Sequence, residues 1–247
     1  MNILVIPMEE QVKGQFNNGK ILENKPIGFP QDGGKQKPYS NLFYWAHAWS
    51  NEGSLIEEHP HKGFEIMSFV LKGEIEHYDN KNDEWKLLSE GDAQIIRAGS
   101  GISHAENFKP GSHIFQIWMD PGLETTLKQT PSYDDYKSNL FPISKIDDGI
   151  KVKIYKGEGS PFKMDTPEVS INEYLCEKGT YNIELDENQI YSAYLIEGSL
   201  MINNNTLEAN SFAIIKQLKN FELKSNEKSK LFVINSPLKV DYTTYYK

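Results

Sequence analysis

The chain has 247 residues, enough for one large domain or two of ordinary size. Its formal net charge of −9 opposes unassisted binding to nucleic acid or to an anionic membrane surface, because both carry negative charge. The single cysteine, Cys176, excludes an internal disulfide and is expected to be a small buried apolar residue. The apolar run in MNILVIPMEE is too short for a secretion signal or a membrane span, so we expect a cytoplasmic protein.

The first half of the chain is predicted to form β strands. The runs FEIMSFVLKGEIEHYDN and EWKLLSEGDAQIIRAG are rich in β-branched and aromatic residues and are punctuated by Gly73, Gly91 and Gly99. A further strand, HIFQIWMDP, is ended by Pro121. These short, turn-bounded segments are typical of an all-β domain.

The middle of the chain is more polar, and strands resume after it. PSYDDYKSNL (131–140) has a helical pattern, and we interpret it as part of a linker with at most a short helix. The strands predicted beyond it are YNIEL, YSAYLIEGSLMI, NSFAIIK and KSKLFVINSP. The second half is therefore also predicted to be all-β.

The two halves share an internal repeat. SFVLKGEIE (68–76) aligns with AYLIEGSLM (193–201), with Gly73 over Gly198 and an offset of 125 residues. LSEGDAQIIR (88–97) aligns with LEANSFAIIK (207–216) at an offset of 119. Any two hairpins share alternating apolar residues, but two matches in the same order at nearly the same offset favour duplication. We predict two all-β domains, residues 1–130 and 151–247, joined by a linker over 131–150.

Two pairs of residues have the spacing of metal ligands. His59 and His61 stand at i and i+2, so on a strand they share a face with side chains roughly 7 Å apart at the base. This pair alone is a weak signal. His104 and Glu106 in GSGISHAEN repeat the spacing, and on a neighbouring strand about 4.8 Å away they would add a nitrogen and a carboxylate oxygen to the same site.

The other three histidines are given ordinary roles. His47, between Trp45 and Trp49, is expected in an aromatic-lined barrel wall. His77 ends a strand near a turn and is expected to be solvated. His113 is expected at the surface, although its position at the start of a strand also allows it to line a pocket.

HPHKGFE (59–65) together with GSGISHAE (99–106) resembles the pirin family of cupin proteins. Lys62 stands where many pirins have Arg, and Ala105 where many have Ser. The resemblance implies a bicupin fold, with two cupin (jelly-roll-like) β-barrels in one chain. It also implies a single metal site in the first barrel. By position, the implied metal ligands are His59, His61, His104 and Glu106.

The general cupin pattern places its metal carboxylate at Ile66, one residue after Glu65. Glu106 is therefore the expected carboxylate, as in pirins. Glu65 is either a residue that supports a metal ligand through a hydrogen bond, which we prefer, or a strand residue paired with a neighbouring base.

Carrying the two ligand pairs into the second half gives Glu184, Asp186, Leu223 and Ser225. Carboxylates without imidazoles make a poor transition-metal site, so the C-terminal barrel is predicted to be metal-free.

The implied cofactor is one divalent transition metal per chain, with Fe(II) as the first choice and Mn, Co, Ni, Cu or Zn as alternatives. Four protein ligands on an ion that prefers six leave two positions for water, O2 or a chelating substrate. Several pirin-like proteins are quercetin 2,3-dioxygenases. The resemblance therefore implies an oxidoreductase that cleaves a planar flavonol with O2, with Glu106 as a catalytic residue and NLFYWAHAW (41–49) as a pocket wall.

The alternative function comes from a different class of protein. Some pirins are non-catalytic, redox-responsive regulators that bind a protein partner, and the acidic chain permits a basic one. Under either hypothesis we expect no direct contact with nucleic acid or membrane.

Overall fold

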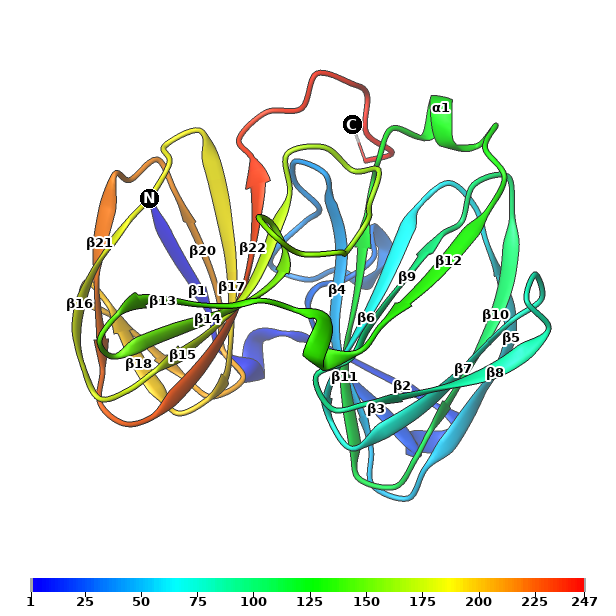
Figure 1. Cartoon of the computed structure of the whole chain (residues 1–247), viewed down its shortest axis with the longest axis horizontal. Helices are drawn as coiled ribbons and strands as arrows, with labels where there is room; N and C mark the ends of the chain where they lie inside the picture. Colours follow the sequence, from blue (N-terminus) through cyan, green and yellow to red (C-terminus); the bar gives the residue numbers. More distant parts are fainter. Residues whose placement is uncertain (1, 247) are drawn as a thin grey trace. The chain divides into compact units, whose positions relative to one another are not determined.

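The computed structural model describes residues 2–246, which form β strands and turns with very little helix (Figure 1). The helical segments among these residues are α1 (Leu123–Thr126) and the 3-10 turns Met8–Glu10, Asn17–Gly19, Pro30–Asp32 and Ser138–Leu140. No helix in this part of the chain is long and apolar enough to cross a membrane.

The chain divides into two compact units. The first, called here the N-terminal barrel, comprises Gln11–Asn139, Met164–Pro167 and Asp241–Lys247. The second, the C-terminal barrel, comprises Met1–Glu10, Leu140–Lys163 and Glu168–Val240.

Two antiparallel sheets make up the N-terminal barrel. The larger has the order β12 (Ser132–Tyr136), β9 (Ala93–Arg97), β6 (Glu65–Lys72), β11 (Ser112–Met119), β4 (Leu42–Ser50), β3 (Ile21–Ile27) and β2 (Val12–Phe16). The smaller has the order β5 (Ser54–His61), β10 (Ile102–Phe108), β7 (Glu74–Asp79) and β8 (Glu84–Ser89).

Two sheets of the same sizes make up the C-terminal barrel. The larger has the order β1 (Ile3–Ile6), β20 (Phe212–Lys216), β17 (Gln189–Glu197), β22 (Ser229–Pro237), β15 (Ser170–Cys176), β14 (Ile150–Lys156) and β13 (Ile143–Asp147). The smaller has the order β16 (Gly179–Glu184), β21 (Asn220–Ser225), β18 (Ser199–Ile202) and β19 (Asn205–Glu208).

The two barrels repeat one topology strand by strand, which confirms the predicted pair of cupin barrels. The order β16-β21-β18-β19 matches β5-β10-β7-β8, and β20-β17-β22-β15-β14-β13 matches β9-β6-β11-β4-β3-β2. The aligned glycines Gly73 and Gly198 make equivalent turns with φ of 70° and 85°, a backbone region that a residue with a Cβ rarely adopts.

The units differ from the predicted ranges at both ends of the chain. Strand β1 pairs with β20 and so belongs to the C-terminal barrel, although its residues open the sequence. The segment Asp241–Tyr246 belongs to the N-terminal barrel, where Asp120 holds it: Oδ2 accepts the Tyr245 N–H at 2.6 Å, and the carbonyl oxygen accepts the Tyr242 hydroxyl at 2.5 Å.

The segment 131–150 also differs from a simple linker. Ser132–Tyr136 is a strand that pairs with the edge of β9, and Ile143–Asp147 is a strand that pairs with β14. The helical pattern of PSYDDYKSNL yields only the 3-10 turn Ser138–Leu140. The free edge of β9 offers backbone hydrogen bonds that outweigh the weak local helical preference.

Side-chain alternation gives the N-terminal barrel a polar layer between two apolar clusters. On β6, Ile66 and Val70 belong to different clusters, and Ser68 lies between them on the same face. On β11, Gln116 lies in the same way between Ile114 and Trp118. The candidate site lies in this polar layer.

Candidate metal centre

Three of the predicted ligands converge on one point. Strands β5 and β10 are antiparallel neighbours in which His59 stands opposite His104 and His61 opposite Ile102. The Nε2 atom of His104 lies 3.0 Å from Nε2 of His59 and 2.9 Å from Nε2 of His61. His104 is fully buried, whereas His59 and His61 are partly exposed, so the cluster is reached from the β5 side.

Hydrogen bonding among the three rings does not account for this arrangement. The Nδ1 atom of His59 is 2.8 Å from the carbonyl oxygen of Glu57, and because a carbonyl only accepts, Nδ1 carries the proton. A neutral His59 then directs a bare Nε2 lone pair at His104. A single Nε2 of His104 carries at most one hydrogen and cannot form a good bond to both neighbours, whereas a cation satisfies all three lone pairs.

A bulge in β5 sets the position of His59. Two residues of β5, Glu57 and Glu58, lie opposite the single residue Ala105 of β10, so β5 carries one extra residue before the histidines. Bulges next to functional sites redirect side chains. Here the extra residue also supplies the carbonyl group that fixes the His59 tautomer.

Glu106 is buried and held by hydrogen bonds from two strands of the larger sheet. Its Oε2 accepts from Nε2 of Gln116 at 2.8 Å, and its Oε1 accepts from the Ser68 hydroxyl at 3.2 Å. Ser68 in turn accepts from Gln94, whose Oε1 accepts the hydroxyl of Tyr133 on β12. The carboxylate is therefore fixed by a polar chain that reaches β12.

Burial controls the charges of these groups. It lowers the pKa of His61 to about 4, with His59 as a second cause, and it lowers the pKa of His104 well below its usual range. Burial raises the pKa of Glu106, although His59, Gln116 and Ser68 oppose that rise. Neutral imidazoles carry the lone pairs that a metal ligand needs.

The structure gives His77 a different place from the solvated one predicted. His77 is fully buried on β7, directly opposite Glu106 on β10, and its ring centroid is 5.3 Å from that of His104. Among the described residues, potential ligand atoms form two groups, each within 4.8 Å: His59, His61 and His104, and His77, His104 and Glu106. The missed signal was alternation, since Ile75, His77 and Asp79 are all buried on one face of β7.

Glu65 does not support a metal ligand, so the preferred sequence interpretation was wrong. Its neighbour Ile66 shares a face with Ser68, and alternation turns Glu65 to the other face of β6. There its carboxylate accepts the backbone N–H groups of Asp165 and Thr166 at 2.7 and 2.8 Å. Arg97 Nε lies 3.8 Å away, which fits the alternative of a strand residue near a base.

His47 and His113 lie together on neighbouring strands. Nε2 of His47 is 3.2 Å from Nδ1 of His113, with the Trp49 ring nearby. His47 is buried among aromatic rings, as predicted, and His113 is half-buried. Neither falls in the two groups of potential metal ligands found within the described residues.

An aromatic cluster borders the three histidines. The Trp118 ring meets His61 edge-on with centroids 4.8 Å apart, and it also packs near Phe43, Tyr44 and Phe64. The start of the predicted aromatic wall, Phe43 and Tyr44, is thus part of this cluster.

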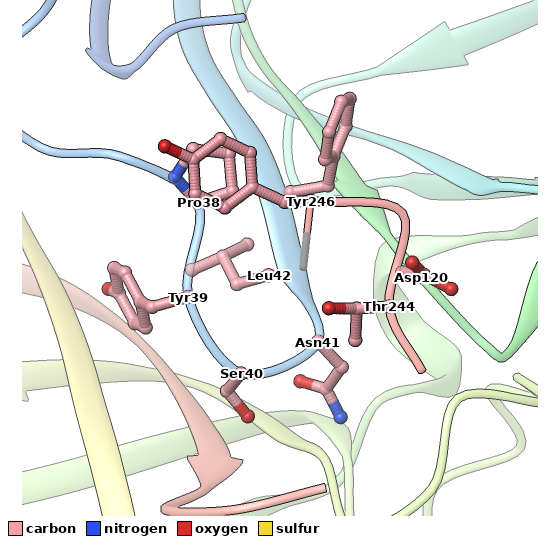
Figure 2. Close-up of a pocket in the computed structure, with 9 residues that line it drawn as sticks. Pro38, Tyr39, Ser40, Asn41, Leu42, Asp120, Thr244 and Tyr246 are labelled. Carbon is pink, nitrogen blue, oxygen red and sulfur yellow. The ribbon is translucent and has the colours of Figure 1, made fainter. Parts of the chain in front are cut away.

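The C-terminal segment packs against the aromatic cluster. Tyr245 packs edge-on against Phe43 and Phe64. Figure 2 shows Thr244 and Tyr246 of this segment lining a small pocket with Asn41 and Leu42, beside Asp120. This pocket and the histidine cluster have no lining residue in common.

The equivalent place in the C-terminal barrel is apolar. When Gly73 is aligned with Gly198, His77 corresponds to Ile202. His77 pairs with Glu106 across the sheet, and Ile202 pairs with Leu223. Phe221, two residues before Leu223, corresponds to His104, and it pairs with Ile183 on β16. By strand pairing, the residues equivalent to His59 and Glu106 are therefore Ile183 and Leu223, and not Glu184 and Ser225 as the sequence offset gave. Phe221 and Leu223 line an apolar pocket together with Tyr174 and Tyr191.

Comparison with known proteins agrees with this architecture. Residues 35–119 match the family model described as Pirin. A pirin-like protein of Caulobacter vibrioides is 34% identical over 104 residues, which are 40% of this chain and 37% of that protein. A quercetin 2,3-dioxygenase of Escherichia coli K12 is 42% identical over 67 residues, which are 26% of this chain and 28% of that enzyme.

The likeness also extends to solved structures. The crystal structure of the bacterial pirin YhhW of Escherichia coli in complex with nickel(II) has a TM-score of 0.77 and 20% identity, and the match covers 96% of this chain and 100% of that one. At this identity the likeness concerns the fold alone. By sequence, this chain spans between 37% and 54% of the length of the first three curated relatives it matches.

Proposed function

Because the chain belongs to the pirin family, we propose that its N-terminal barrel binds one divalent transition metal and uses it to cleave a flavonol with O2. The proposed ligands are His59, His61, His104 and Glu106. The single observation that carries the proposal is the convergence of three histidine Nε2 atoms at 2.9 and 3.0 Å.

The spacing of these nitrogens favours an ion with open positions. Two nitrogens about 2.1 Å from an ion are about 3.0 Å apart at a right angle and about 3.4 Å apart in a tetrahedron. The observed distances of 2.9 and 3.0 Å fit right-angled ligands, as in five- or six-coordinate ions. Three imidazoles with one carboxylate suit Fe(II), Mn(II), Co(II), Ni(II) or Cu(II), with Fe(II) as our first choice, and Zn(II) as a further candidate.

The surroundings of the cluster suit a flat, oxygen-bearing ligand. A bound metal would supply a Lewis acid that polarises a chelating hydroxyl and carbonyl pair. Trp118, packed against His61, offers an aromatic ring beside the partly exposed side of the cluster. Glu106, held in place by hydrogen bonds from Gln116 and Ser68, would accept the proton of the substrate hydroxyl.

The test is turnover of quercetin under air by protein loaded with Fe(II). We expect loss of the flavonol absorbance together with oxygen uptake. Both should disappear after metal removal and in the variant His104→Ala, which removes the nitrogen common to both short contacts. Binding without turnover would favour the non-catalytic regulator, and the absence of any spectral change on mixing would contradict the substrate class.

A further inference from the structure

His77 is a fully buried polar side chain to which the proposed function gives no role. Its exposed fraction is 0%, and neither Nδ1 nor Nε2 has a hydrogen-bond partner among the described residues. A buried imidazole with two unpaired nitrogens costs free energy, and native proteins keep such groups where they serve a ligand or a function.

The polar side chains next to His77 make their hydrogen bonds to other groups. Oδ2 of Asp79 is 4.0 Å from Nε2 of His77, too far for a hydrogen bond. The Asp79 carboxylate instead accepts the backbone N–H groups of Lys81 and Asn82 and the side-chain amide of Asn82. Tyr133 stacks face to face on the His77 ring at 4.6 Å and 10°, and its hydroxyl bonds to Gln94 and Asp135.

The same ring faces two of the proposed ligands. His77 stands opposite Glu106 in the β7–β10 ladder, and one of its ring nitrogens lies within 4.8 Å of ligand atoms of both Glu106 and His104. Trans ligands about 2.1 Å from an ion are about 4.2 Å apart, so small side-chain rotations close this set on an ion. All three side chains are buried.

We infer that His77 is a metal ligand on the buried side of the site, forming with His104 and Glu106 an inner set that shares His104 with the outer set of His59, His61 and His104. The inference rests on the proposed metal site and adds a second binding position to it. Two imidazoles and one carboxylate are the ligands of non-haem Fe(II) sites with open positions. The inner set therefore takes a divalent ion of the Fe(II) type. His59, His61 and His104 by themselves offer nitrogen alone, and the carboxylate of the proposed four-ligand site is the same Glu106, so the two positions share Glu106 as well as His104.

The two sets make different predictions for variants. Replacing His59 and His61 together by Ala destroys the outer set and leaves the inner set complete. Replacing His77 by Phe removes both ring nitrogens but keeps an aromatic ring to stack on Tyr133. The variant His77→Gln serves as a second form if the Phe variant does not fold, and His47→Phe is the matched control, since His47 is a buried histidine outside both sets.

The experiment titrates metal-free protein with Co²⁺, followed by its visible absorption and by elemental analysis after desalting. We expect wild type to bind one ion and His77→Phe to bind it at least tenfold more weakly, because loss of a direct ligand costs no less than loss of a residue that only supports one. The His59→Ala/His61→Ala protein should retain one weaker equivalent with a changed cobalt spectrum. Adding His77→Phe to it should abolish binding, and His47→Phe should match wild type.

Two results would overturn the inner set. The first is a His59→Ala/His61→Ala protein that binds no Co²⁺ while wild type does. The second is residual binding in that protein that the addition of His77→Phe leaves unchanged. A wild-type protein that binds no Co²⁺ would refute the proposed function itself, which separates the two failures.

Discussion

A hydrogen bond at the far nitrogen of His59 prepares its near nitrogen for a metal. Nδ1–H of His59 donates a hydrogen bond to the Glu57 carbonyl, which leaves Nε2 without a proton, 3.0 Å from Nε2 of His104. His104 differs, because its Nδ1 is buried and has no hydrogen-bond partner among the described residues. A hydrogen bond therefore fixes the ring of His59, whereas the ring of His104 has a buried nitrogen without such a bond.

The first residue-scale prediction concerns Glu106. Changing Glu106→Gln keeps the shape but removes the negative charge that offsets a divalent cation, and it sets an amide group against the Gln116 amide. We expect metal affinity to fall by at least about tenfold, the lower limit for residues that only support a ligand, with the fold retained. Isothermal titration with Ni²⁺ measures the loss. Unfolding of the variant with metal still bound would show that the carboxylate is structural.

The second residue-scale prediction concerns acid stability and His47. Burial, with His113 as a second cause, lowers the pKa of His47 to about 3, whereas the unfolded value is about 6.5. Between these values the unfolded state holds a proton that the folded state lacks. The stability that neutral His47 contributes is therefore complete above about pH 6.5 and is lost as pH falls toward 3, by about 1.4 kcal/mol per pH unit within that window.

Tryptophan fluorescence measures this effect in the N-terminal barrel alone, because Trp45, Trp49, Trp85 and Trp118 all lie there. Urea unfolding of metal-free protein at pH 7.5 and pH 5 should show a smaller loss of stability for His47→Asn than for wild type. Equal losses in the two proteins would mean that His47 does not resist protonation in the folded state.

At the scale of elements, a strand bulge, an added edge strand and the C-terminal segment position the side chains around the site. The bulge in β5 sets the aim of His59, and β12 brings Tyr133 to the edge of β9, where it bonds Gln94 and stacks on His77. The C-terminal segment is held by Asp120, which follows β11, and Tyr245 closes the aromatic cluster that leads through Trp118 to His61.

The element-scale prediction tests the Asp120 anchor. The carboxylate accepts the backbone N–H of Gly122 at 2.9 Å and of Tyr245 at 2.6 Å, so an amide at this position turns an NH2 group against one of these donors. We expect Asp120→Asn to destabilise the N-terminal barrel by about 1–3 kcal/mol. Urea unfolding followed by tryptophan fluorescence measures this, with Asp241→Asn on the exposed part of the segment as the control. Equal stability of the two variants would refute the anchor.

At the scale of the whole molecule, one topology occurs twice with different interiors. The layer that holds His77, His104 and Glu106 in the N-terminal barrel is replaced by Ile202, Phe221 and Leu223 in the other. An apolar layer packs without a ligand, whereas the polar layer leaves unpaired nitrogens. The duplicated barrels have therefore separated into one suited to an ion and one suited to packing.

The whole-molecule prediction follows from this separation. A metal at 100 times its Kd should stabilise the N-terminal barrel by about 2.7 kcal/mol. Hydrogen exchange with and without Ni²⁺ should show slower exchange in β5, β7 and β10 and no change in β16, β18 and β21. Equal protection of both barrels would contradict a metal site confined to the N-terminal barrel.

The sequence by itself determined the two-barrel architecture and three converging histidines. The repeat around Gly73 and Gly198 and the i, i+2 spacing of the ligand pairs are local patterns, because strand periodicity and turn glycines act within a few residues. The metal-ligand spacing of His59 and His61 could be recognised for the same reason.

Only the tertiary structure decided the placement of His77, Glu65, β1 and the C-terminal segment. His77 looked like a strand-end residue until the β7–β10 register set it against Glu106. Glu65 was turned from the site by alternation on β6, and its partners Asp165 and Thr166 lie about 100 residues along the chain. Strand β1 belongs to the C-terminal barrel although it opens the sequence, and residues 241–246 belong to the N-terminal barrel although they close it. Alternation indicates which face His77 and Glu65 occupy, but their partners, like those of β1 and of residues 241–246, come from distant segments whose pairing leaves no periodic trace in the sequence.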